Sequence, residues 1–395
     1  MKTTNRKTQH SPSNPSEAQE PHPENRSPRP ETDLLIGLHV EKNLARPALA
    51  RLAEDLDAWT GPGPGSTERL ARELGVPKRQ LETALAALPG ARAAGAAERE
   101  RAAAFGGRIV TRLDSDYPPA LGQLPLPPPV LSIAGELPTG PAVAIVGSRR
   151  ADAYGLEVAT LFASALAERE IAVISGFARG IDAAAHRGAL APLSGRTVAI
   201  LGCGLGIDYP RGHAALGKAI AARGALVSEF PCGYEPRSWN FPVRNRSIAA
   251  LSQAVLVVQA AARSGSLSTA RWALDLGRDL FAVPGQIFDE RSLGPHALLR
   301  DGAFLAQHPK DLFELFAPPA ARQLSIPIKE AEAPEPPLPG LAGAILEALV
   351  PGFDRAPEDL AVATGAPIDR VLATLLELEL LGRVLRMPGG RYRRG

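Results

Sequence analysis

Cysteine is scarce in this chain of 395 residues, which contains only Cys203 and Cys232. Two isolated thiols exclude a disulfide-stapled scaffold, and without a C-x-x-C pair or a Cys/His array we expect no structural zinc site. Long hydrophobic runs are also lacking, because no stretch reaches the roughly 18 apolar residues that a membrane-spanning helix needs. Residues 1–29 show no apolar core of a secretory signal. These absences predict a cytoplasmic protein without membrane contact.

An excess of charge of one sign is lacking as well, since 44 Lys and Arg residues face 42 Asp and Glu residues. The net charge of +2 does not indicate a protein that binds nucleic acid through bulk charge alone. The cations are nevertheless uneven in type, with 37 Arg and 7 Lys. Arg offers a planar fork for phosphates and bases, whereas genomic base composition explains the same bias. Composition leaves both interpretations open.

Changes of pattern along the chain divide it into five segments. Residues 1–31 are predicted to form a disordered tail rich in Pro and Ser. Residues 32–105, with leucines at three- and four-residue spacings, predict a small helical domain of the SAM or helix-hairpin type. An α/β domain is expected over residues 106–317. A linker rich in Pro, Ala and Glu follows at 318–338, and residues 339–395 form the last domain.

Six short apolar runs alternate with helical stretches in the α/β domain. The expected strands are residues 142–146, 172–175, 197–201, 226–228, 254–258 and 280–283. Buried strands that alternate with helices favour a mainly parallel sheet covered on both faces. The predicted fold class is therefore an extended, doubly wound Rossmann-like α/β domain, whose ligands gather beyond the carboxyl ends of the strands.

The last domain shows three helices followed by a hairpin, which is the order of a winged helix-turn-helix. Helices are expected over residues 341–349, 357–364 and 367–381, followed by a β-wing around the turn at 388–390. The third helix of such a module can enter a DNA groove, but here it carries Glu377 and Glu379. Reading of duplex DNA and packing against protein are both open interpretations.

Glycine and arginine gather at the turns that follow the predicted strands. Gly147, Ser148 and Arg149 end the first strand. There a glycine admits a ligand to the backbone, a helix N-terminus offers free N–H groups, and an arginine adds a bidentate fork. Arg179 lies in a similar turn after the second strand. These turns predict an anion site, and the alternative is that Arg149 only pairs with a surface carboxylate.

Asp182 and His186 follow that second turn and stand four residues apart, so they share a helix face. The spacing suits a metal pair or an acid–base couple, but no third ligand or nucleophile accompanies them, and a role in bracing the loop is favoured. The glycines at 202, 204 and 206 do not form G-x-G-x-x-G, and neither a P-loop nor G-x-S-x-G occurs. No catalytic residue, metal ligand or cofactor is therefore predicted.

Cations and aromatic rings interleave between residues 237 and 246. The candidates there are Arg237, Trp239, Phe241, Arg244, Asn245 and Arg246. Cations that follow a phosphate backbone beside rings on which bases stack are typical of single-stranded nucleic acid binding. The alternative is that the rings belong to the core and the arginines decorate a loop. Further along, Ser264 and Ser266 are either phosphate donors or helix caps.

The ordered series of motifs resembles the DNA-processing protein A (DprA/Smf) family. The series comprises Gly147-Ser148-Arg149, residues 175–182 through His186, residues 228–231, 241–246 and 264–267, and residues 281–285. The resemblance covers the whole α/β domain. It implies a protein without catalysis that binds single-stranded DNA, forms a homodimer and loads RecA recombinase during natural transformation. It also implies that Arg149 grips phosphate and that Arg244 and Arg246 form a basic patch.

Three positions depart from the family pattern. Gln259 stands where an acidic residue is common, Ser268 where an aliphatic residue is common, and Pro295 where Asn is expected. A second functional hypothesis is a nucleotide-binding enzyme of the phosphoribohydrolase-like Rossmann group. Such enzymes resemble this domain in fold, but the segment 284–287 lacks the loop that supplies their catalytic carboxylate.

Overall fold

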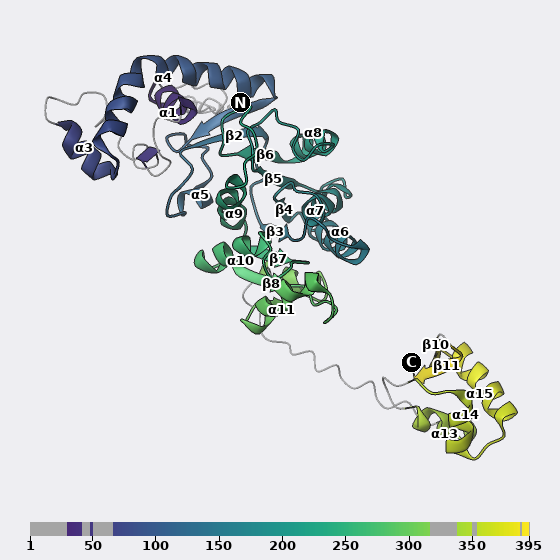
Figure 1. The fold of residues 1–395 in the computed structure, drawn as a ribbon. Coiled ribbons are helices and arrows are strands. Elements are labelled where there is room, and N and C mark those ends of the chain that lie inside the picture. Colours follow the sequence, from purple (N-terminus) through teal and green to yellow (C-terminus); the bar gives the residue numbers. More distant parts are fainter. Residues whose placement is uncertain are drawn as a thin grey trace, which may run out of the picture. The chain divides into compact units, whose positions relative to one another are not determined.

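The computed structural model describes residues 30–41, 48–49, 66–316, 338–349, 354–387 and 389–394. The chain divides into two compact units, residues 1–317 and residues 318–395, and Figure 1 colours it from purple to yellow. Nearly all of the predicted tail and nearly all of the predicted linker lie outside the described residues. The division into five segments therefore stays a prediction.

The described residues before the sheet include three long helical segments. They are α1 (Pro30–Glu41), α3 (Ser66–Leu74) and α4 (Lys78–Ala104). Helices α1 and α4 pack so closely that a Cβ added to Gly37 would lie 1.7 Å from the Ala91 carbonyl oxygen. The same pair joins the α/β region, since the buried Glu98 of α4 accepts the backbone N–H of Cys232 at 2.6 Å. The helical segment and the sheet thus share one core.

A nine-stranded sheet follows, in the order β1-β2-β6-β5-β4-β3-β7-β8-β9. Its strands are β1 (Gly107–Thr111), β2 (Val130–Gly135), β3 (Ala142–Val146), β4 (Ala172–Ser175), β5 (Thr197–Leu201), β6 (Ala225–Ser228), β7 (Ala254–Val257), β8 (Asp279–Ala282) and β9 (Phe304–Leu305). The strands from β6 to β9 pair in parallel, whereas β1 and β2 are antiparallel at one edge. Because the order reverses beside β3, a topological switch point lies between β3 and β7.

The six predicted strands are confirmed to within one residue at either end. Strands β1, β2 and β9 were not predicted. The first two belong to an antiparallel edge and lie outside the run of alternating strands and helices. β9 has only two residues, both exposed, which is too short for any hydrophobic period to be visible.

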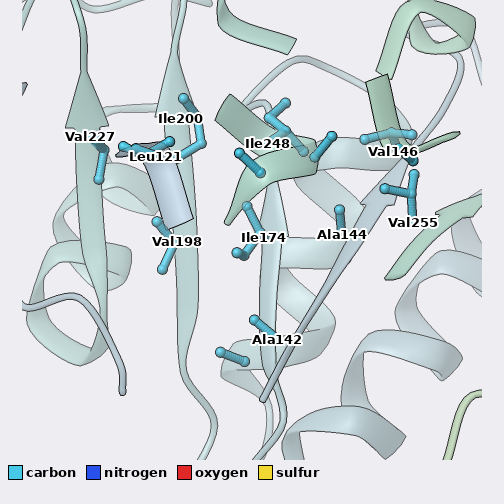
Figure 2. Close-up of a cluster of buried hydrophobic side chains, with 14 of the residues drawn as sticks. Leu121, Ala142, Ala144, Val146, Ile174, Val198, Ile200, Val227, Ile248 and Val255 are labelled. Atoms are coloured by element: carbon cyan, nitrogen blue, oxygen red, sulfur yellow. The ribbon is translucent and has the colours of Figure 1, made fainter. Parts of the chain in front are cut away.

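Helices cover both faces of the sheet. They are α5 (Pro119–Gly122), α6 (Ala153–Ala167), α7 (Ile181–Leu190), α8 (Ala214–Arg223), α9 (Asn240–Ala250), α10 (Ser266–Asp275), α11 (Leu293–Arg300) and α12 (Lys310–Phe313). Side chains alternate along β3, so Val143 and Ile145 join the core under α6 and α7. Ala144 and Val146 join the opposite core with Ile248 of α9 (Figure 2). The doubly wound α/β prediction is confirmed.

The second unit has its own buried core, formed mainly by Ile345, Leu360, Val371, Leu375 and Val384. Its elements are α13 (Leu341–Ala348), α14 (Pro357–Thr364), α15 (Ile368–Leu380), β10 (Val384–Met387) and β11 (Arg391–Arg394). The two strands form an antiparallel hairpin. This order of elements agrees with the predicted winged helix.

The described part of the chain contains no helix that combines the length and the apolar character needed to cross a membrane.

The close approach of α1 and α4 gives a test of the first unit. Gly37→Ala should lower the free energy of unfolding by about 3 kcal/mol, because the new methyl group meets backbone that cannot move aside. Gly90→Ala in α4 is the matched control, since an added Cβ there meets nothing within 4 Å and helix propensity favours Ala by about 1 kcal/mol. Urea unfolding measures both, and equal stability of the two variants would contradict the packing.

Candidate nucleic-acid interface

A pocket of about 760 Å³ opens at the switch point between the carboxyl ends of β3 and β7. Its walls are the turn after β3, the segment from the end of β7 into α10, and the start of α9. We call it the switch-point pocket. Its lining comprises Val146, Gly147, Ser148, Arg149, Arg150, Ala178, Asp182, Tyr209, Pro236, Arg237, Ser238, Phe241, Pro242, Arg244, Asn245, Ile248, Ala261, Ser264, Gly265, Ser266 and Thr269.

The turn after β3 holds Arg149 at the pocket. A Cβ added to Gly147 would lie 2.7 Å from Ile181 Cγ1, so only glycine fits this crowded corner without a shift. The next residue, Ser148, donates its N–H to the Gln259 carbonyl at 2.7 Å. Arg149 itself is exposed, and its guanidinium lies 4.7 Å from the centre of the Phe241 ring. It forms no ion pair with any described residue, which argues against simple pairing with a surface carboxylate.

Arg244 lies beneath the pocket rather than projecting into solvent, with 3% of its surface exposed. Its Nη1 group donates to the carbonyls of Gly176 and Ile200, at the carboxyl ends of β4 and β5. A Cβ added to Gly176 would lie 2.6 Å from both Arg244 Nη1 and Asp182 Oδ2. The glycine therefore leaves the space in which cation and carboxylate meet.

Burial is the largest cause of the pKa shifts of both Asp182 and Arg244. Burial raises the pKa of Asp182, although the neighbouring Arg244 and the N–H of Ala178 oppose the rise. Burial also lowers the pKa of Arg244 to about 10, which leaves the guanidinium charged at neutral pH. A buried guanidinium with a carboxyl group beside it therefore lies under the pocket.

Phe241 forms part of the pocket wall and is half-buried. Its ring rests on Gly202, where an added Cβ would lie 2.7 Å from the ring carbons. The Tyr209 ring lies 5.7 Å away between centroids, and the Arg244 guanidinium lies 5.9 Å from the Phe241 centroid. Arg149 and Phe241 together present a cation and an aromatic surface to one ligand.

A second cation–aromatic group lies at the rim. The guanidinium of Arg237 is 5.2 Å from the centre of the Trp239 ring and 5.9 Å from that of Tyr234. Trp239 is 58% exposed, so it is not a core residue. The alternative that the rings of this stretch all belong to the core does not fit Trp239.

The structure brings together nine of the twelve predicted site residues. Gly147, Ser148, Arg149, Arg237, Phe241, Arg244, Asn245, Ser264 and Ser266 line the pocket, whereas Arg179, Trp239 and Arg246 do not. Asn245 ties α9 to α10, because its amide donates to the Gly265 carbonyl and to Ser268 Oγ. The hydroxyls of Ser264 and Ser266 bond each other at 2.7 Å, so both candidate phosphate donors lie side by side.

Arg246 is placed differently from the basic patch that the family resemblance implied. It is 9% exposed, pairs with the buried Glu229 at 2.8 Å and donates to the Leu126 carbonyl. Its charge is therefore balanced away from the pocket. Contact of any of these residues with DNA stays a prediction.

Several lining residues were not predicted. Arg150 follows directly on the Gly-Ser-Arg turn, so its neighbours could have indicated it. Tyr209 comes from the long connection after β5, where no pattern signals a site. Ser238 and Thr269 are short polar residues without a distinctive spacing.

Asp182 and His186 do not act as a couple. Each is buried and has its own partner: Asp182 accepts from the Ala178 N–H at 3.2 Å, and His186 Nδ1 lies 2.7 Å from Thr197 Oγ1. The Thr197 hydroxyl donates to the Val173 carbonyl at 2.6 Å, so it accepts from a protonated Nδ1 of His186. These bonds fit the bracing role that the sequence favoured. Within the described ranges, no group of His, Cys, Asp and Glu could hold a metal ion.

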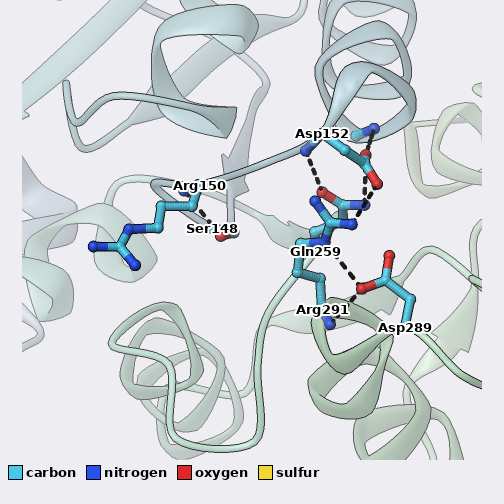
Figure 3. Close-up of polar contacts among 7 residues, drawn as sticks. Ser148, Arg150, Asp152, Gln259, Asp289 and Arg291 are labelled. Atoms are coloured by element: carbon cyan, nitrogen blue, oxygen red, sulfur yellow. Dashed lines mark hydrogen bonds and ion pairs between the residues drawn. The ribbon is translucent and has the colours of Figure 1, made fainter.

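A polar network braces the rim beside β7 (Figure 3). Asp152 Oδ1 accepts from the Gly155 N–H and from the Gln259 side-chain amide, both at 2.9 Å. Arg291 pairs with Asp152 and with Asp289, also at 2.9 Å each. Arg291 already forms ion pairs with two carboxylates, Asp152 and Asp289. An acidic residue at position 259 would add a third negative charge to this network, whereas the amide of Gln259 is neutral.

Known proteins match both units. A family model described as DNA recombination-mediator protein A matches residues 108–317, and a DprA winged helix domain model matches residues 329–390. Protein Smf of Escherichia coli (strain K12) is 42% identical over 286 residues, which cover 70% of this chain and 75% of that protein. DNA processing protein DprA of Streptococcus pneumoniae (strain ATCC BAA-255 / R6) is 39% identical over 206 residues, which cover 52% and 72%.

A solved structure agrees with these matches. The X-ray structure of DNA processing protein A (DprA) from Streptococcus pneumoniae has a TM-score of 0.63 and 30% sequence identity, and the match covers 71% of this chain and 97% of that one.

Removal of the Arg244 side chain should destabilise the folded protein around the pocket. Arg244→Ala leaves Asp182 and two strand-end carbonyls without their cation, and should lower the free energy of unfolding by about 3–5 kcal/mol. Arg149→Ala removes an exposed guanidinium and should change stability by about 0.5 kcal/mol or less. Urea unfolding compares the variants. Equal losses would show that Arg244 is not a structural cation.

His186 should make stability depend on pH. Burial lowers the pKa of His186 to about 3 in the folded protein, against an ordinary value of 6.5. Below pH 6.5 His186 therefore binds a proton in the unfolded chain but stays neutral in the folded protein. The free energy of unfolding consequently decreases as the pH falls towards 3. Between pH 7 and pH 5 the loss amounts to about 2 kcal/mol.

The test compares wild type with His186→Asn, whose amide can still donate to Thr197. Urea unfolding at pH 7 and at pH 5 should show the smaller decrease in the variant, while other titrating groups contribute equally to both. Parallel decreases in the two proteins would mean that His186 is not buried as a neutral ring.

Proposed function

The chain belongs to the DNA recombination-mediator protein A family, and we propose that it binds single-stranded DNA across the switch-point pocket. The observation that carries the proposal is the joint lining of one pocket by the exposed cations Arg149 and Arg237 and the ring of Phe241. Cations beside an aromatic face suit a flexible strand, whose phosphates and bases are both accessible.

The chemistry of the lining supports a division of contacts. Arg149 and Arg237 would neutralise phosphates, and the hydroxyls of Ser264 and Ser266 would donate to phosphate oxygens at the N-terminus of α10. Phe241 would stack on a base inside the pocket and Trp239 on a base at the rim. None of these contacts depends on a particular base, so we expect little sequence preference.

We infer that the protein acts by binding and not by catalysis. The one carboxylate of the pocket lining, Asp182, is buried and held against Arg244 and the Ala178 N–H. Glu229, the other buried carboxylate of this region, is bonded to Arg246 and Ser247. A nucleotide-cleaving enzyme needs a carboxylate free to approach its substrate, which makes that second hypothesis the weaker one.

We further propose that the chain works as a homodimer in natural transformation and loads RecA recombinase onto the strand. The description of the matching family as a recombination mediator and the description of the relatives as DNA processing proteins support this proposal. The winged helix exposes Leu372, Leu376 and Leu380 on α15, which favours contact with protein over reading of duplex DNA.

Single-strand binding should depend on the pocket cations and on salt. Arg149→Ala and Arg237→Ala should each weaken binding of labelled oligo-dT and reduce the slope of log K against log salt by about 0.7, because each removes one phosphate contact. Fluorescence anisotropy over a salt series measures both quantities.

Arg179→Ala is the matched control, since Arg179 is exposed near the same sheet edge but does not line the pocket. It should leave affinity and slope close to those of wild type. If all three variants lost the same amount of affinity and slope, binding would depend on the overall positive charge of the surface and not on the pocket.

A further inference from the structure

A turn after β8 displays two large apolar side chains. The N–H of Asp289 donates to the Gln286 carbonyl at 3.1 Å, which closes a β-turn with Ile287 and Phe288 at its centre. Ile287 is 74% exposed and Phe288 is 94% exposed. Turn centres normally hold glycine or short polar residues, so two exposed apolar residues at this place indicate a contact surface.

The turn is held in place on both sides. Before it, the Tyr154 hydroxyl donates to the Pro284 carbonyl at 3.3 Å. After it, the Asp289 carboxylate accepts from both the N–H and the Nε of Arg291 at 2.9 Å, and Arg291 also pairs with Asp152 (Figure 3). Phe288 is therefore presented by a fixed backbone, which reduces the entropy lost when a ligand stacks on it.

The turn adjoins the switch-point pocket through the segment 259–261. On one side Ser148 donates to the Gln259 carbonyl, and on the other Ala260 donates to the Arg291 carbonyl at 2.7 Å. Ala261 and Arg150 belong to the pocket lining. Arg150 is exposed, and Tyr154, which bonds the turn, is 50% exposed. Backbone hydrogen bonds on both sides of one short segment thus connect the pocket with the turn, and Tyr154 adds an exposed aromatic side chain that bonds the turn.

We propose that Phe288 is a second stacking site for single-stranded DNA, on which a base rests after the strand has left the pocket on the side of the segment 259–261. The proposal rests on the proposed function and extends it, because it gives the direction of the strand on the β8 side. The occupant is a nucleobase with its sugar, bound by stacking and without hydrogen-bond readout.

Charge distinguishes this site from the pocket. Arg291 is occupied by Asp152 and Asp289, and the neighbouring Glu290 is exposed. The turn therefore offers an aromatic face and no cation for a phosphate. Its contribution to binding should be nearly independent of salt, whereas the contributions of Arg149 and Arg237 fall as salt rises.

The test is a length series of labelled oligo-dT with the full chain, using strands of about 4 and about 16 nucleotides. Phe288→Ala should weaken binding of the long strand by roughly 5- to 100-fold and leave the short strand unaffected, because the short strand fills only the pocket. The loss should be the same at low and high salt. Phe288→Trp should retain wild-type affinity. The long strand should quench its fluorescence more than that of wild type, which already has Trp239 at the rim, whereas the short strand should quench the two proteins equally.

Leu193→Ala is the matched control, because Leu193 is 96% exposed and precedes β5 at the amino end of the sheet. Wild type that bound neither strand would disprove the proposed function itself. Wild type that bound both strands, with Phe288→Ala indistinguishable from it at both lengths, would overturn the stacking site alone and leave the turn to a protein partner. Equal weakening of both strands would also overturn it, since Phe288 would then act through the pocket.

Discussion

The bond of the buried Arg244 guanidinium to two strand-end carbonyls is the interaction on which the site depends. A cation without water is costly unless its donors find acceptors and its charge finds an opposite charge. Here Gly176 and Ile200 supply the acceptors and Asp182 supplies the charge. Because Arg244 belongs to α9 and its acceptors end β4 and β5, this bond fixes the helix against the sheet. The position of Phe241, one helical turn earlier, follows from it.

The cations of this region therefore divide into two kinds. Arg244 and Arg246 lie inside the protein. Arg244 interacts electrostatically with Asp182, and Arg246 forms an ion pair with Glu229. Arg149 and Arg237 are exposed on the surface. Each guanidinium lies against an aromatic ring, a contact that leaves its N–H groups able to donate hydrogen bonds. Arg244 and Arg246 stabilise the structure around the pocket, whereas Arg149 and Arg237 give the pocket surface its positive charge.

Sequence reasoning located the pocket but not this division. Buried strands and the glycines after them are local patterns, so the sheet and the turns at Gly147 and Ser264 could be predicted. Burial of Arg246 depends on Glu229 and Leu126, which come from distant elements, and no spacing in the sequence brings these residues together. For the same reason Tyr209 was missed, and nothing in the sequence pattern singled out the exposed Phe288.

The two kinds of cation also bear on the proposal that the pocket binds a strand without catalysis. Catalysis by proton transfer needs a group that titrates near neutral pH and reaches the ligand. Asp182, the carboxyl group of the pocket lining, and His186 of the same helix are buried and bonded to fixed partners. The exposed charges are guanidinium groups, which do not lose their protons in proteins. The cationic surface of the pocket thus keeps a constant charge near neutral pH, so the proposed binding of a phosphate chain should depend on salt concentration and not on pH.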